Sequence, residues 1–499
     1  MPSKAVAVAE QVVMPTAEKP SIGMDFIASG EISAGQTVGL KSDGTIEVIT
    51  GTSSGTVVNV GTPTVYESAK STSSSATFDS SQNKIVVAYR DEGNSHRGTA
   101  VVGTVSGSSI SFGAPVTFTS STAFNFSAIF DSSQNKVVIA YRDDGNSFWG
   151  TAIVGTVSGT SISFGTPEVF AATTVDYPSA TFDSNSNKVV IAYRDSTDSA
   201  RGKGVVGTVS GTSISFGTPA TFTSSITSYV AVSFDSNSNK AVIGYRDDSN
   251  SKRGTAVVGT VSGTSISFGA PVVFESSTIY FMTSAFDSDC NKVVFAYRAG
   301  SGKAAVGTVS GTSISFGTPV TFYGASVSNM SATFDSNSNK VVIACMAPLS
   351  GTNVGTAVIG SIYENSISFD TTIVYRSGAP AWHNAATFDS ITNQVVIAYA
   401  DNGNSDWGTG ITLELIEQEG TTNASSWIGI ARETIASGSS GLINLVGSID
   451  NNQTGLTIGA SYYLNYDGTL TTVPYEGVSD GTHGKVGMAL SPTQLHLTK

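Results

Sequence analysis

Short apolar segments alternate with polar turns along most of the chain, and the same succession of segments returns seven times. Each copy contains Phe-Asp-Ser, then a polar turn, then an apolar run. The phenylalanines that mark the copies are spaced 52, 52, 52, 52, 48 and 54 residues apart: Phe78, Phe130, Phe182, Phe234, Phe286, Phe334 and Phe388. A period of about 50 residues built only from short β-segments is typical of propeller blades, each a four-stranded sheet. The sequence therefore predicts an all-β fold with a seven-bladed β-propeller.

The second copy shows the four strands of a blade. Residues 124–131, 136–142, 150–156 and 162–170 are separated by polar turns. The second of these segments is almost wholly apolar, as expected of a strand that neighbouring sheets cover on both faces. Pro167 lies within the fourth segment, and proline cannot donate a hydrogen bond to a strand ladder. The fourth segment is therefore predicted to be the outermost strand of its blade.

The seventh copy, residues 384–417, supplies only three strands. We expect the missing fourth strand at the other end of the repeat region, because residues 57–66 match the pattern of residues 162–170. A last blade that mixes strands from both ends closes the ring and leaves no long exposed sheet edge.

The residues outside the repeats form three segments. Residues 1–23 contain three prolines and no periodic pattern, which predicts a loose N-terminal arm. Residues 24–52 and 419–499 show strand-and-turn patterning without the blade repeat. We expect these two segments to fold together as one small β-domain, with the propeller, residues 53–418, inserted between them. The order of strands in a blade predicts that both ends of the propeller leave from one face, where the small domain would form a base.

Composition and charge argue against several classes of function. The 38 acidic and 25 basic residues give a net charge of −13, whereas a nucleic-acid-binding surface normally shows a basic stripe. No apolar stretch approaches the roughly 20 residues that a membrane span needs, so no membrane insertion is expected. Glu10 interrupts the N-terminal apolar run before a signal-peptide core would form, which predicts assembly in a cytoplasm. Cys290 and Cys345 fall in different blades, so we expect no disulfide framework.

The repeats differ from one another on one face only. Turns after the first and third strands hardly change, whereas the segments before the first strand and after the second strand change in every copy. Variable loops on a rigid scaffold usually carry binding, and aromatic tips suit sugar faces or protein anchors. The candidate ligand-binding residues on this variable face are Phe124, Phe126, Phe148, Trp149, Tyr177, Tyr229, Tyr280, Phe281, Trp382, His383 and Trp407. The alternative, which the sequence leaves open, is that each aromatic residue only caps its blade.

A Tyr-Arg-Asp triplet ends the second strand in the first four copies, with Arg90, Arg142, Arg194 and Arg246 at its centre. The later copies depart from it and read Tyr297-Arg298-Ala299, Cys345-Met346-Ala347 and Tyr399-Ala400-Asp401. A ring of arginines would suit an anion. An Arg–Asp pair that locks neighbouring loops is the favoured interpretation, because four blades use the triplet in the same way.

Signals for catalysis are weak. The four histidines, His96, His383, His483 and His496, lack the spacing of metal ligands. The chain contains no Gly-x-Ser-x-Gly elbow, no Walker loop and no Gly-x-Gly-x-x-Gly. Sialidases are propellers too, but their Ser-x-Asp-x-Gly-x-Thr-Trp boxes do not occur here. We therefore expect no enzyme activity, no cofactor and no catalytic or metal-binding residue.

Several glycine-turn patterns resemble those of virion structural proteins from tailed bacteriophages, of the head-decoration or tail-fibre type. The patterns are residues 26–32 (FIASGEI), 42–45 (SDGT), 427–431 (WIGIA) and 485–491 (KVGMALS) at the two ends, and VVIAYRD with GTAVVGTVSGTSISFGTP in the repeats. The repeat resembles structural proteins of marine phages, including those of cyanobacteria. These patterns are not catalytic, so the resemblance transfers no functional residue.

The resemblance implies a non-enzymatic protein on the surface of a virion. The base would bind other virion proteins, and the propeller face would bind a host or environmental ligand, for which we expect a glycan. A homo-oligomer or multi-copy array is expected, because many weak sites gain affinity when copies are arrayed on a particle. The sequence leaves two alternatives open: a bacterial surface lectin or adhesin, and, with less support, a glycan-cleaving enzyme that would need a carboxylate pair.

Overall fold

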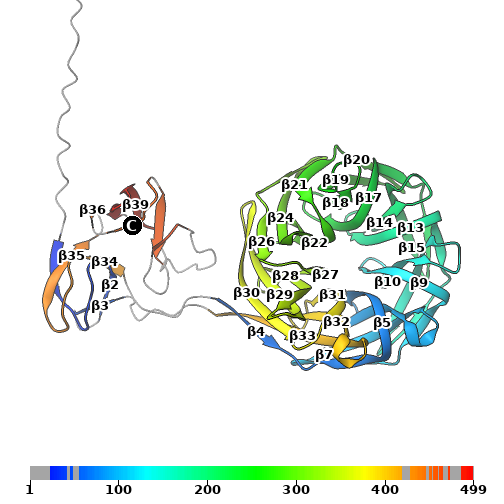
Figure 1. Cartoon of the computed structure of the whole chain (residues 1–499), viewed down its shortest axis with the longest axis horizontal. Coiled ribbons are helices and arrows are strands. Elements are labelled where there is room, and N and C mark those ends of the chain that lie inside the picture. Colours follow the sequence, from blue (N-terminus) through cyan, green and yellow to red (C-terminus); the bar gives the residue numbers. More distant parts are fainter. Residues whose placement is uncertain are drawn as a thin grey trace, which may run out of the picture. The chain divides into compact units, whose positions relative to one another are not determined.

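The computed structural model describes residues 23–41, 45–48, 55–418, 427–445, 449–451, 453–458, 460–464, 470–472 and 485–497. The chain divides into two compact units, Thr56–Ile416 and the combination of Met1–Gly55 with Glu417–Lys499 (Figure 1). Both are built from β-strands, and the described residues contain only two short 3-10 helices, η1 (Glu92–Asn94) and η2 (Asn402–Asn404). None of the described helices is long and apolar enough to cross a membrane.

The larger unit is a ring of antiparallel sheets, one for each sequence repeat (Figure 1). The strands of the first repeat are β5 (Thr64–Asp79), β6 (Lys84–Asp91), β7 (Arg97–Ser106), β8 (Ser109–Phe112) and the start of β9 (Val116–Asp131). Within this sheet the second half of β5 is the inner strand, and β8 with the start of β9 forms a split outer strand. The prediction of an all-β propeller is confirmed.

The other repeats follow the same order. Their strands are β10 (Lys136–Asp143), β11 (Trp149–Ser158), β12 (Ser161–Phe164), β13 (Glu168–Asp183), β14 (Lys188–Asp195), β15 (Arg201–Ser210), β16 (Ser213–Phe216), β17 (Ala220–Asp235), β18 (Lys240–Asp247), β19 (Arg253–Ser262), β20 (Ser265–Phe268), β21 (Val272–Thr278), β22 (Tyr280–Asp287), β23 (Lys292–Ala299), β24 (Ser301–Ser310), β25 (Ser313–Phe316), β26 (Val320–Tyr323), β27 (Ser328–Asp335), β28 (Lys340–Leu349), β29 (Thr352–Tyr363), β30 (Ser366–Arg376), β31 (Ala381–Asp389), β32 (Gln394–Asp401) and β33 (Trp407–Gln418). Blades 1 to 7 are numbered here by the inner strands β5, β9, β13, β17, β22, β27 and β31.

Long strands join neighbouring blades. The first part of β9 pairs with the third strand of blade 1, where Val116 lies opposite Ala100. The second part pairs with the second strand of blade 2, where Phe130 lies opposite Val137. One strand is therefore the outer edge of one sheet and the inner edge of the next, which leaves few free edges along the ring.

The last blade closes the ring with strands from the other end of the repeat region, as predicted. Strand β33 lies next to β4 (Gly55–Val60) and pairs with the start of β5, where Thr409 lies opposite Val65. The amide of Gly61 donates to the carbonyl of Thr412 at 2.9 Å. In Figure 1 the blue β5 lies beside the orange β33.

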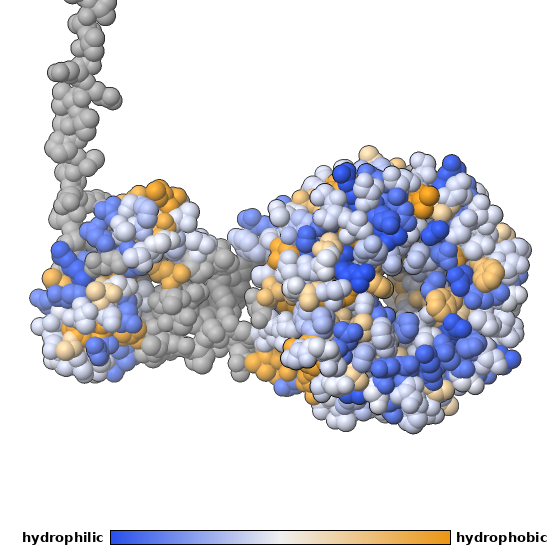
Figure 2. Space-filling model, in the orientation of Figure 1, coloured by the Kyte–Doolittle hydropathy of each residue, from blue (hydrophilic) through white to orange (hydrophobic). Residues whose placement is uncertain are grey.

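The propeller core lies between adjacent sheets. Val138 and Ala140 of blade 2 pack with Val189, Ile191 and Tyr193 of blade 3 in one fully buried cluster. The same tyrosine recurs as one of the largest buried side chains in six blades: Tyr89, Tyr141, Tyr193, Tyr245, Tyr297 and Tyr399. Apolar burial of this kind contributes about 1.5–3 kcal/mol for each large side chain, so the second strands hold the blades together. The face of the ring seen in Figure 2 is mainly hydrophilic or neutral, with scattered hydrophobic residues.

The smaller unit contains a sheet built from both ends of the chain. Its strand order is β1 (Gly23–Ile27), β35 (Ser440–Leu445), β34 (Trp427–Ala431), β2 (Thr37–Leu40) and β3 (Ile46–Val48). Ile32, Val38 and Ile46 share its core with Ala431 and Ile443. The predicted small β-domain made from the two chain ends is therefore confirmed. Within the predicted N-terminal arm, residues 1–22 lie outside the described residues, as does the turn at residues 42–44.

A second sheet in the smaller unit comes from the C-terminal segment alone. Its order is β36 (Ile449–Asp450), β40 (Gln494–Leu497), β39 (Lys485–Ser491), β37 (Ser461–Leu464) and β38 (Leu470–Thr471). Its buried residues Ala489, Leu495 and Leu497 pack with Leu456 and with Ile430 of the first sheet. The two sheets thus share one apolar contact region.

Candidate functional site

Each inner strand of the propeller carries a β-bulge at the same place. A residue with positive φ, between 46° and 55°, interrupts the pairing with the second strand in every blade: Ser73, Asn125, Tyr177, Tyr229, Phe281, Asn329 and His383. A bulge bends its strand and re-aims side chains. We call this residue and the one before it the bulge pair. Seven of the predicted binding residues belong to bulge pairs: Phe124, Tyr177, Tyr229, Tyr280, Phe281, Trp382 and His383. They lie within inner strands and not in loops before them, which corrects the sequence interpretation.

An arginine at the end of the second strand lies beside the bulge pairs in several blades. The guanidinium carbon of Arg142 is 5.4 Å from the ring centroid of Phe124, and that of Arg90 is 5.0 Å from the same ring. Arg246 lies 4.7 Å from the ring of Tyr229 and 5.2 Å from that of Tyr280 in the next blade. These are cation–π contacts, and they place each arginine between the bulge pairs of neighbouring blades.

The Arg–Asp pairs differ from those predicted. Arg142 pairs with Asp144, one residue beyond the Tyr-Arg-Asp triplet, at 2.7 Å, and with Asp176 of the next blade at 2.8 Å. The aspartate of the triplet instead accepts hydrogen bonds within its own loop, as Asp143 does from the amide of Gly145 at 3.1 Å. This is an Asx-type turn, so Asp143 shapes the loop and Asp144 neutralises Arg142.

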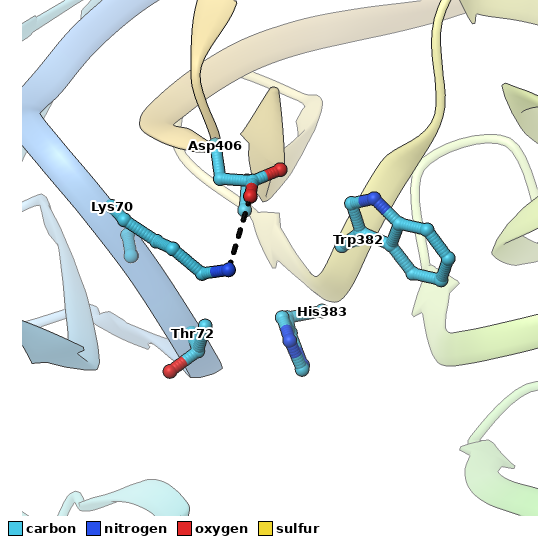
Figure 3. A pocket seen from close by; sticks show the side chains of 7 residues that line it. Lys70, Thr72, Trp382, His383 and Asp406 are labelled. Atoms are coloured by element: carbon cyan, nitrogen blue, oxygen red, sulfur yellow. Dashed lines mark ion pairs between the residues drawn. The ribbon is translucent and has the colours of Figure 1, made fainter. Parts of the chain in front are cut away.

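In the seventh blade the arginine position is Ala400, and a pocket of about 110 Å³ lies there. Seven residues line it: Lys70, Ser71, Thr72, Trp382, His383, Ala400 and Asp406 (Figure 3). They come from β5, β31, β32 and the loop before β33, where blades 7 and 1 meet. Because Ala400 has no side chain beyond Cβ, the space that a guanidinium occupies between other blades stays open here.

One wall of the pocket is an ion pair between the closing strand β5 and the loop before β33. Lys70 Nζ lies 3.2 Å from Asp406 Oδ2, and Figure 3 shows both groups directed toward the pocket centre. Asp406 Oδ1 accepts a hydrogen bond from Asn402 Nδ2 at 2.9 Å, and the carbonyl of Asp406 accepts one from the amide of Ser71 at 2.9 Å. The carboxylate is therefore held in place by groups on both sides.

The opposite wall consists of the bulge pair Trp382-His383. Both side chains are half-buried, and the amide of His383 donates to Asn329 Oδ1 of the preceding blade at 3.2 Å. Burial lowers the pKa of His383 below its ordinary value, and the nearby positive charge of Lys70 lowers it further, against the opposing effects of Asp406 and Glu92. His383 is therefore neutral in neutral solution and offers one donor and one acceptor.

This arrangement suits a small uncharged ligand with many hydroxyl groups. Trp382 supplies an apolar part of the lining, while Lys70, Asp406, His383 and Thr72 supply donors and acceptors. A concave site with a few converging polar groups and a shifted pKa is the usual form of a small-molecule site. Among the lining residues Asp406 is the one carboxylate, so the pocket itself does not hold the carboxylate pair that glycoside hydrolysis generally needs.

Four of the remaining aromatic candidates form a second group away from the pocket. The rings of Tyr177 and Tyr229 lie 5.3 Å apart, and Tyr229 lies 5.6 Å from Phe281 and 6.3 Å from Tyr280. We call these four residues the aromatic arc. All four are half-buried, and they follow one another across blades 3, 4 and 5. The bulges thus bring residues separated by about 50 positions into direct contact.

Five candidates belong to neither group. Phe124, described above, lies between Arg90 and Arg142. Phe126 is 8% exposed and packs against Phe118 and Tyr141, so it is a core residue. Phe148 stands at a loop tip, 46% exposed, with its ring 5.5 Å from the guanidinium of Arg142. Trp149 and Trp407 each begin a third strand and are half-buried.

The polar half of the pocket was not predicted from the sequence. Lys70, Thr72 and Asp406 come from a strand and a loop at opposite ends of the propeller segment, and no motif connects them. One signal was present, because the Tyr-Arg-Asp triplet becomes Tyr399-Ala400-Asp401 in the seventh repeat alone. The pocket opens at this position, where alanine replaces the arginine of the triplet. In the part of the chain that the structure describes, no three His, Cys, Asp or Glu side chains are grouped so that they would hold a metal ion.

No protein-family model matches the chain, and no curated protein matches its sequence. Among solved structures, the BP39L lectin from Burkholderia pseudomallei is similar with a TM-score of 0.50 and 14% identity, over 74% of this chain and 100% of that chain. AofleA from Arthrobotrys oligospora, and a variant of it with three arginines replaced by alanine, each give a TM-score of 0.41 at 11% identity, over 70% of this chain and 96% of theirs. At this level of identity the likeness to BP39L shows a shared fold.

Proposed function

We propose that the protein is a non-enzymatic, carbohydrate-binding β-propeller that holds one sugar unit in the pocket between blades 7 and 1. The observation that carries the proposal is the pocket itself: Trp382 lines a site whose other walls are the Lys70–Asp406 pair and the neutral His383. A sugar ring offers an apolar C–H face for an aromatic ring and hydroxyl groups for charged and neutral hydrogen-bonding partners. That BP39L, which has the same fold, is a lectin supports this choice of ligand class.

This function corresponds to the lectin alternative of the sequence analysis better than to the virion hypothesis. None of the three similar structures is named as a virion protein. Display on a phage particle, in a head-decoration or tail-fibre position and in many copies, is a further proposal that rests on the glycine-turn resemblance alone. It is compatible with sugar binding, because a particle-borne lectin gains affinity through multivalency.

The proposal is tested by applying the full chain to an array of neutral mono- and oligosaccharides, together with Trp382→Ala and Trp149→Ala variants. Trp149 is the matched control, since it is a half-buried tryptophan on the same face of blade 2 and does not line the pocket. We expect selective binding that Trp382→Ala reduces at least ten-fold and Trp149→Ala leaves unchanged. Absence of binding to every neutral sugar, or equal binding by all three proteins, would contradict the proposal.

A further inference from the structure

Blade 5 differs from blades 2 and 4 in the loop between its second and third strands. In blade 4 five residues separate β18 from β19, whereas in blade 5 Gly300 alone separates β23 from β24. Gly300 has a φ of 76°, which a one-residue connection requires and which glycine adopts without strain. This shorter loop accounts for the 48-residue spacing between Phe286 and Phe334.

The shortened loop removes the carboxylate that neutralises the arginine in blades 2 and 4. Asp144 and Asp248 stand two residues after Arg142 and Arg246 and form ion pairs with them. The corresponding residue in blade 5 is Gly300, after Arg298. Among the described residues no carboxylate oxygen lies within 4.0 Å of the Arg298 guanidinium nitrogens. Arg298 therefore presents a positive charge that its neighbours do not cancel.

The guanidinium of Arg298 is held in one orientation. Its central carbon lies 4.8 Å from the ring centroid of Tyr280 and 4.8 Å from that of Phe281. Its Nη1 donates to Oγ of Ser326, an exposed residue, at 3.3 Å. A guanidinium that is fixed by aromatic contacts and keeps further N–H groups free is well suited to a planar or tetrahedral anion.

A second arginine borders the other end of the aromatic arc. Arg194 lies near Tyr177, and the residue two positions after it is Ser196, where blades 2 and 4 have aspartate. Its Nε is buried without a hydrogen-bond partner. The nearby Asp176 is already engaged by Arg142 at 2.8 Å and by Ser196 Oγ at 2.7 Å. The arc thus runs between two arginines that no described carboxylate pairs with, while Arg246 in its middle is neutralised by Asp248.

We propose that the aromatic arc with Arg298 is a second, separate binding site, which takes an acidic sugar of a glycan. The carboxylate or sulfate group of that sugar binds Arg298, and adjoining sugar units lie along Phe281, Tyr229 and Tyr177. The choice of a glycan rests on the proposed function; the choice of an acidic one rests on the unpaired guanidinium. A protein with net charge −13 repels anions at long range, so the attraction is local, and added salt weakens it.

The test uses the full chain and titrates it with two acidic oligosaccharides, a galacturonate trisaccharide and a sulfated galactose disaccharide. Their uncharged counterparts, the methyl-esterified trisaccharide and the unsulfated disaccharide, serve as ligand controls. We expect at least one acidic form to bind at least ten-fold more tightly than its uncharged counterpart, with affinity that falls as salt is added. The pair that shows the difference identifies a carboxylate or a sulfate as the anion.

Three variants locate the site. Arg298→Gln should lower the affinity for the acidic oligosaccharide at least five-fold, Arg298→Lys should restore part of it, and Arg97→Gln, a half-buried arginine on the same face of blade 1, should leave it unchanged. Melting temperatures of the variants confirm that each is folded. Equal binding of acidic and uncharged ligands, or no loss with folded Arg298→Gln, overturns the proposal. Trp382→Ala should not affect binding of the acidic ligand. A parent protein that binds the acidic oligosaccharide but no neutral sugar would contradict the proposed function and not this site.

Discussion

Nζ of Lys70 lies 3.2 Å from Oδ2 of Asp406, and this ion pair joins the N-terminal closing strand to the loop before β33 at the point where the ring closes. Lys70 is on β5, which supplies an outer strand to the last blade, and Asp406 precedes β33, which pairs with that strand. The lysine side chain is about half exposed, so the pair itself contributes at most about 1 kcal/mol to stability. Its larger consequence is to fix a cation and an anion at the mouth of the pocket.

The pocket is open because residue 400 is an alanine, so a large side chain at this position should fill it. Ala400→Arg restores the residue that stands at this position in five other blades, so the ring should accommodate it. The guanidinium would lie between Trp382 and Thr72, where the ligand is expected. We predict at least a ten-fold loss of sugar affinity, measured by calorimetry with the sugar that the array identifies, and a melting temperature within a few degrees of the parent.

Ala400→Ser is the control for this prediction, because it changes the same position without filling the pocket. It should bind the sugar nearly as well as the parent protein. Full binding by a folded Ala400→Arg variant would mean that the ligand lies elsewhere on the face.

The sequence allowed most of the fold to be predicted, because each repeat carries its own strand and turn pattern. Closure by an N-terminal strand was also predictable, since residues 57–66 match the outer-strand pattern of the complete repeats. The bulges were not predictable, because Tyr229 and Phe281 adopt positive φ values of 50° and 46°, and bulky residues rarely adopt them. The tertiary structure, and not local preference, imposes that conformation.

The candidate binding site was predictable only in part. Trp382 and His383 stood out as aromatic residues that vary between repeats, but a pocket also depends on a residue that is small. Ala400 carries no chemical signal by itself, and the partners of the pocket come from the first and last blades. Likewise, Arg298 differs from Arg246 through a missing loop residue, which a search for motifs does not detect.

The neutral form of His383 predicts a pH dependence of sugar binding. Its pKa is lowered from 6.5 by burial and by Lys70, while Asp406 and Glu92 act in the opposite sense. Protonation would add a second positive charge beside Lys70 and remove the acceptor on the ring. We therefore expect affinity to be constant above pH 6.5 and to fall at lower pH, and we expect His383→Gln to remove this decline.

The lowered pKa of His383 also predicts how the stability of the folded protein changes with pH. The unfolded chain takes up the proton at the ordinary pKa, before the folded protein does, so the contribution of His383 is complete above pH 6.5 and is lost as the pH falls below it. Denaturant unfolding of the parent and of His383→Gln at pH 7.5 and 5.5 measures this difference. A parent protein that loses no more stability than the variant between these pH values would contradict the assignment of a neutral histidine.

The closure of the ring predicts that β4 and the start of β5 stabilise the whole propeller. Deletion of residues 1–70 removes the strand that pairs with β33 and removes Tyr66, which packs against Tyr89 and Phe112. Loss of one such buried aromatic residue typically costs about 3–5 kcal/mol, and β33 would also be left with an unpaired edge. Deletion of residues 1–54 is the matched control, because it removes β1, β2 and β3 of the smaller unit and keeps the closing strands. We expect calorimetry to show a large fall in the melting temperature of the propeller for the longer deletion only; equal melting temperatures would show that the ring does not depend on its N-terminal strand.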